Sequence, residues 1–201
     1  MKKYFFSTLV IAAMLFSAVL VSSCDNDDDD DNGNGNGNGG AITNINAAVQ
    51  GVGSTQITSV KLIYELEDDG VVLATGTFTG GRLQITLPNT VSANLLSAVY
   101  FGNGVRNPTN ALAARARLIA FNGEEDVGDI DFHNQAETVW AWLIYVDRDV
   151  VISSSTVPGS DTWEASFKKG WNFVFETENA NGTVNKTSLR PSGMGWYFWG
   201  G

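Results

Sequence analysis

The chain has 201 residues, with 12 Lys and Arg against 22 Asp and Glu, and a formal net charge of -10 at pH 7. An acidic chain repels the phosphates of nucleic acid, so these counts exclude nucleic acid as a partner. The length is typical of one domain or of two small ones.

The first 23 residues have the organisation of a secretory signal peptide. Lys2 and Lys3 precede an apolar stretch over residues 4–21, and the small residues Ser22 and Ser23 follow it. A signal-anchor that stays in the membrane is the alternative, because this apolar stretch approaches the roughly 20 residues that span a bilayer. We predict a signal peptide over residues 1–23.

The stretch L-V-S-S-C, which ends at Cys24, resembles a bacterial lipoprotein lipobox. The resemblance implies cleavage before Cys24 and acylation of that residue, although Val21 and Ser23 replace the commoner leucine and glycine or alanine. Cys24 is the sole cysteine, which excludes a disulfide framework. Because each buried methylene contributes about 0.8 kcal/mol, several acyl chains would hold the protein stably on a membrane.

Residues 24–40 are rich in Asp, Asn and Gly, and we predict a flexible tether. Its aspartates are Asp25, Asp27, Asp28, Asp29, Asp30 and Asp31. Asp28, Asp30, Asn32 and Gly33 match the opening of a calcium-binding loop, but Gly39 stands where that loop needs a bidentate glutamate. A solvated spacer is therefore the better interpretation.

Residues 41–201 contain short apolar runs separated by Gly, Asn and Asp, which predicts an all-β domain. Residues 57–67 alternate so that one face is apolar, and residues 82–88 and 162–168 show the same period of two. The side chains predicted to face inward include Val60, Leu62, Tyr64, Leu83, Ile85, Leu87, Trp163, Ala165 and Phe167. Residues 138–146 are apolar on both faces, which predicts a central strand with Trp140 and Trp142 in the core.

About ten such strands, with almost no helical periodicity, favour an antiparallel β-sandwich. The alternative is a division into two smaller β-domains near residues 103–110, where the turn-forming sequence G-N-G-V-R-N-P-T-N lies.

The combination of a lipobox, the tract C-D-N-D-D-D-D-D, the motif F-K-K-G-W-N-F-V-F and the ending P-S-G-M-G-W-Y-F resembles small lipoproteins of Bacteroidota. The resemblance implies that residues 25–31 direct export to the outer face of the outer membrane, to which the lipid at Cys24 would anchor the chain. It supplies no catalytic residue. The first half of the β region also resembles transthyretin-like or immunoglobulin-like folds.

The densest acidic cluster of the β region comprises Glu124, Glu125, Asp126, Asp129 and Asp131. Clustered carboxylates bind calcium, and a carboxylate pair hydrolyses glycosidic bonds. The alternative is a solvated hairpin turn, because turns attract these residue types. Glu124, Glu125 and Asp126 are the only metal-ligand candidates that we retain, and they are weak ones.

His133 is the sole histidine, and no G-x-S-x-G elbow accompanies it. A zinc site would need two further strong ligands, which the chain lacks once Cys24 is acylated. We therefore predict no cofactor and no enzymatic activity.

All six tryptophans follow residue 139. We predict that Trp163 and Trp171 lie in the core, whereas Trp196, Tyr197 and Trp199 are the candidates for an exposed surface that stacks on sugar rings. The sequence predicts a non-catalytic, lipid-anchored binding or interaction module. A glycan-binding accessory lipoprotein is the alternative, and a glycoside hydrolase ranks below both.

Overall fold

The computed structural model describes residues 41–65, 70–154 and 161–200. The predicted signal peptide, Cys24, the aspartates at residues 25–31 and the tether all lie outside these residues. Within the described ranges there is no helix with the length and apolarity needed to span a membrane.

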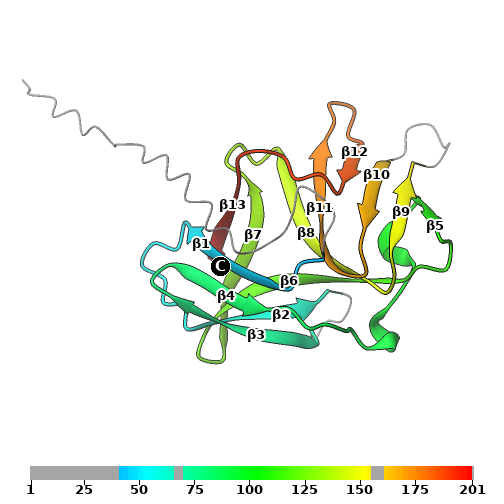
Figure 1. The fold of residues 1–201 in the computed structure, drawn as a ribbon. Helices are drawn as coiled ribbons and strands as arrows, with labels where there is room; N and C mark the ends of the chain where they lie inside the picture. Colours follow the sequence, from blue (N-terminus) through cyan, green and yellow to red (C-terminus); the bar gives the residue numbers. More distant parts are fainter. Residues whose placement is uncertain (1–40, 66–69, 155–160, 201) are drawn as a thin grey trace, which may run out of the picture.

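The strands of the described residues form one continuous sheet (Figure 1). They are β1 (Asn44–Gln50), β2 (Ser59–Tyr64), β3 (Val72–Thr79), β4 (Arg82–Thr86), β5 (Val105–Asn107), β6 (Ala113–Asn122), β7 (Glu125–Asn134), β8 (Val139–Val146), β9 (Val150–Ser153), β10 (Thr162–Phe167), β11 (Gly170–Glu178), β12 (Val184–Thr187) and β13 (Met194–Gly200). Two short 3-10 turns, η1 (Ala93–Leu95) and η2 (Val99–Phe101), lie between β4 and β5.

The sheet closes on itself, so the predicted antiparallel sandwich is wrong. Eight strands form a barrel in the order β1, β4, β3, β2, β6, β8, β7 and β13, and β13 returns to β1. The β1–β13 pairing is parallel, with Val49 opposite Trp196, and β10 and β12 also pair in parallel. In Figure 1, β2, β3 and β4 cross beneath the upright strands β7, β8 and β11. Closure joins the first strand to the last one and removes two sheet edges.

The barrel interior contains the residues that the alternating pattern placed inward. Val60, Leu62 and Tyr64 of β2 are buried, as are Leu83 and Ile85 of β4. Burial of Trp171 is also confirmed: its side chain is 1 % exposed, and its indole N–H donates a 2.9 Å hydrogen bond to the Pro88 carbonyl. The period of two therefore predicted these strand faces correctly.

A second core lies outside the barrel, where β12, β10, β9 and β5 extend the sheet beyond β11. Ile144 and Val146 of β8 pack there with Trp163 and Phe167 of β10. The C-terminal half of β8 is thus buried on both faces, as predicted for a central strand. The extra strands do not cover the N-terminal half, so Trp140 and Trp142 are half-exposed, contrary to the core position that the sequence predicted for them.

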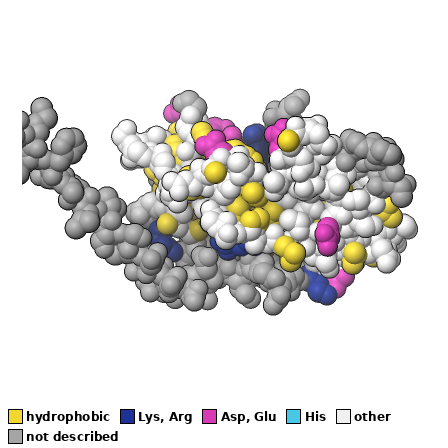
Figure 2. All heavy atoms as spheres, turned by 90° about the horizontal axis from the view of Figure 1, so that it is seen from above, with side chains coloured by type: hydrophobic (Ala, Val, Ile, Leu, Met, Phe, Trp, Pro, Cys, Tyr) yellow, Lys and Arg dark blue, Asp and Glu magenta, His cyan; other side chains and the backbone are white. Residues whose placement is uncertain are grey.

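Apolar side chains also reach the surface on the face seen from above in Figure 2, near its middle, with acidic side chains beside them.

Candidate functional site

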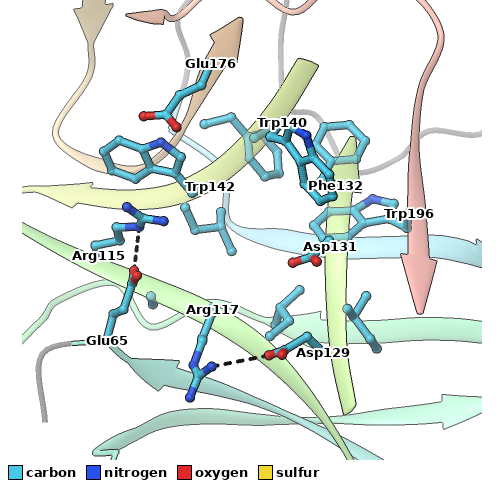
Figure 3. A pocket seen from close by; sticks show the side chains of 16 residues that line it. Glu65, Arg115, Arg117, Asp129, Asp131, Phe132, Trp140, Trp142, Glu176 and Trp196 are labelled. Atoms are coloured by element: carbon cyan, nitrogen blue, oxygen red, sulfur yellow. Dashed lines mark ion pairs between the residues drawn. The ribbon is translucent and has the colours of Figure 1, made fainter. Parts of the chain in front are cut away.

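The strand β6 has two partners, and the fork between them creates a pocket. β6 pairs with β8 through Ala113–Ala116 and with β7 through Leu118–Asn122. The ladder between β7 and β8 is short, and in it Phe132 pairs with Ala141 and His133 with Trp140. The pocket opens between β7 and β8 on the outside of the barrel and has a volume of about 320 Å³ (Figure 3). We call it the fork pocket.

Ion pairs flank the fork pocket on two sides. The Arg115 Nε atom lies 2.5 Å from the Glu65 carboxylate, and the Arg117 Nη1 atom lies 3.5 Å from the Asp129 carboxylate. Both arginines come from β6 and point outward, because alternate residues of a strand share one face. These pairs hold the two guanidinium groups at the sides of the pocket, as Figure 3 shows.

Aromatic rings form much of the remaining wall. The Arg115 guanidinium lies 4.5 Å from the centre of the Trp142 ring, a distance typical of cation–π contact. Trp140 lines the pocket beside it, and Phe132 and Trp196 close the inner end, where their rings stack with centroids 4.6 Å apart. The pocket therefore offers flat apolar surfaces between charged groups.

Asp131 is the pocket carboxylate without an ion pair to any described Lys or Arg. Asp129 pairs with Arg117, Glu65 pairs with Arg115, and Glu176 lies 3.4 Å from the Lys186 ammonium. Burial raises the pKa of Asp131, and the neighbouring Asp129 charge raises it further, while His133 and Arg117 act in the opposite direction. Asp131 is thus a half-buried hydrogen-bond acceptor that lacks a direct ion pair with any described Lys or Arg.

A group of aromatic rings continues from the pocket across β7 to β13, and we call it the aromatic platform. Its centre is His133, which is 1 % exposed. The His133 ring centroid lies 4.1 Å from that of Tyr197, 4.5 Å from that of Trp140 and 5.8 Å from that of Trp199. Because Trp140 belongs to both features, the platform and the fork pocket form one continuous surface.

The three aromatic residues proposed as ligand contacts occupy different environments. Trp196 points into the barrel and is 9 % exposed, although its ring lines the inner end of the pocket. Tyr197 is half-buried in the aromatic platform, and Trp199 is 43 % exposed at its edge.

The predicted acidic cluster divides into two parts. Glu124, Glu125 and Asp126 are exposed at the β6–β7 hairpin, where the Gly128 N–H donates to Asp126. Asp129 and Asp131 instead line the fork pocket. No group of three or more His, Cys, Asp or Glu side chains among the described residues is arranged to hold a metal ion.

The sequence interpretation missed Glu65, Arg115, Arg117 and Glu176. The alternation in A-R-A-R-L-I-A-F and in V-G-D-I-D-F, which places two arginines and two aspartates on outer faces of neighbouring strands, was the available signal. Comparison of the chain with protein-family models, with curated proteins and with solved structures finds no match, so its own geometry is the basis for the interpretation of the site.

Proposed function

We propose that this protein is a non-catalytic, lipid-anchored surface protein that captures glycans with the aromatic platform and the fork pocket. The observation that carries the proposal is the position of Trp140: it is half-exposed, joins the two features, and lies in a pocket that also contains Asp131. Indole faces stack on the apolar faces of sugar rings, while carboxylates and guanidinium groups hydrogen-bond to hydroxyls.

The size and mixed chemistry of the pocket support a small polar ligand with an apolar face. Its volume lies near the lower end of the range of roughly 300–1,000 Å³ that is usual for small-molecule sites. A flat protein–protein interface would not need ion pairs on both sides of a concave surface, so glycan capture is favoured over a general interaction role.

A glycan array probed with the detergent-solubilised full chain tests this function. We expect binding to a restricted set of glycans, and Trp140→Ala should lower the affinity at least about tenfold, as for a central aromatic contact. Val151→Ala is the matched control, because Val151 is an exposed apolar residue of β9 outside the pocket. Absence of any binding would contradict glycan capture, and release of new reducing ends from a bound glycan would contradict the non-catalytic assignment.

The location is tested separately in cells. Cys24→Ala should abolish membrane retention, because it removes the proposed acylation site. Deletion of residues 27–31 should leave the protein anchored but inaccessible to external protease. Full accessibility after the deletion would show that the acidic residues are not an export label.

A further inference from the structure

We propose that the fork pocket selects glycans that carry a free ammonium group, namely unsubstituted amino sugars, with the Asp131 carboxylate as the ammonium acceptor. This inference rests on the proposed glycan capture and specifies its ligand class. It follows from the balance of charges around the pocket.

The charged side chains that line the pocket are Glu65, Arg115, Arg117, Asp129, Asp131 and Glu176. Four acids thus face two bases. Each arginine is already paired with one carboxylate, and Glu176 is paired with Lys186. A cationic ligand would compensate the remaining charge, whereas a glycan with carboxylate or sulfate groups would be repelled.

The charges around Asp131 favour a cationic ligand over an anionic one. Apart from burial, the largest single influence on the pKa of Asp131 is the negative charge of Asp129, which raises it, while His133 and Arg117 lower it. A bound ammonium would relieve both the repulsion and the loss of hydration. Its hydrogen bonds to the carboxylate would be charge-assisted and therefore stronger than those of a hydroxyl.

The aromatic walls suit the rest of such a ligand. An ammonium beside an indole face gains cation–π attraction, and the sugar ring gains apolar contact with the same surface. In Trp142 one face is covered by the Arg115 guanidinium, whereas no described cation covers the ring of Trp140. Trp140 contacts the His133 ring and is half-exposed, so the part of its indole that lines the pocket is the wall that remains available for the ligand.

Titration calorimetry of the full chain in a non-glycosidic detergent tests the inference. The probes are the β-1,4-linked trisaccharides of glucosamine, of N-acetylglucosamine and of glucose, at about pH 6, where an amine with the pKa of an α-amino group, roughly 7.7–8.0, is protonated. We expect the glucosamine trisaccharide to bind at least about tenfold more tightly than the other two, and Asp131→Asn to abolish this preference.

Two control variants separate a local effect from overall charge. Glu125→Gln removes the same charge from the exposed hairpin and should keep the preference. Arg117→Gln leaves Asp129 without its ion pair and removes a hydrogen-bond donor that is common to all three ligands, so it should increase the ratio of glucosamine affinity to glucose affinity. If these side chains had only a structural role, their replacement would lower the affinity for all three trisaccharides by the same factor.

Equal affinity for the three trisaccharides, or a preference that survives in folded Asp131→Asn, would overturn the inference and leave glycan capture intact. If Asp131→Asn does not fold, an Arg117→Gln variant whose preference for the glucosamine trisaccharide over the glucose trisaccharide is unchanged or smaller overturns it instead. Failure of every glycan to bind, here and on the array, would overturn both proposals.

Discussion

His133 and Tyr197 stack across the β7–β13 pair, with ring centroids 4.1 Å apart and ring planes inclined by 22°. The same imidazole contacts Trp140 on the other side, so one buried ring supports aromatic residues from two neighbouring strands. The sole histidine is therefore the structural centre of the aromatic platform rather than an isolated side chain.

Replacement of His133 by alanine should damage both stability and binding. The lost ring leaves a cavity beneath Trp140 and Tyr197, and we expect a decrease of about 2–4 kcal/mol in the free energy of unfolding. Near-UV circular dichroism should show freer aromatic rings, and glycan affinity should fall. His133→Phe keeps a flat ring at this position and should restore most of the affinity, and failure of that rescue would contradict a positioning role.

Asp131→Asn should raise the stability of the protein at neutral pH. Because the folded-state pKa of Asp131 is raised by burial and by Asp129, ionisation of this carboxyl above that pKa destabilises the folded state. The effect disappears as the pH falls below the pKa of the unfolded chain, about 3.9. We expect an increase in melting temperature on the order of 1–2 °C at pH 7 and none near pH 3. The Glu125→Gln control should not shift it.

Asp161 should behave in the opposite sense. Burial opposes its ionisation, but a 3.0 Å hydrogen bond from the Val184 N–H and the Lys186 ammonium at 3.2 Å lower its pKa. Its contribution to stability is present above the unfolded-state pKa and is lost as the pH falls through the lower folded-state pKa. Asp161→Asn should therefore lower the melting temperature at pH 7, and the difference from the parent protein should shrink in acid.

Gly128→Ala should disrupt the β7–β13 pairing. Gly128 has φ of 143°, and a Cβ atom at this position would lie 2.0 Å from the Trp199 carbonyl oxygen. We expect destabilisation of more than about 2 kcal/mol in denaturant unfolding. Gly123→Ala is the matched control: its φ of 64° is also positive, but no atom lies within 4 Å of the added Cβ. Equal destabilisation by the two variants would show that backbone strain alone, and not the contact with Trp199, causes the loss of stability.

Trp171→Phe should destabilise the barrel without a change in glycan affinity. The substitution removes the N–H that bonds the Pro88 carbonyl and leaves a void in the core, which together should cost about 2–4 kcal/mol. Trp199→Phe, at the exposed edge of the platform, should change the unfolding free energy by less than about 1 kcal/mol. Thermal unfolding of the two variants compares their stabilities. If Trp199→Phe proved more destabilising than Trp171→Phe, the assigned positions would be contradicted.

The local pattern determined which residues face the interior. Leu83 and Ile85 alternate with polar neighbours, and each strand displays this period whatever its partner is, so the all-β class and the core faces were predictable. The alternation also placed Trp163 and Phe167 inward, which the second core confirms. Lipid anchoring at Cys24 and export through residues 25–31 stay predictions.

Strand partnership was decided only by the tertiary structure. The pairing of Val49 with Trp196 joins residues at opposite ends of the β region, and this pairing closes a barrel where the sequence predicted a sandwich. The fork pocket likewise exists because the first half of β6 pairs with β8 and the second half pairs with β7. Asp131 of β7 and Trp142 of β8 therefore line the same pocket. Side-chain alternation is a property of a single strand, whereas closure and pockets depend on contacts between strands that are distant in the chain.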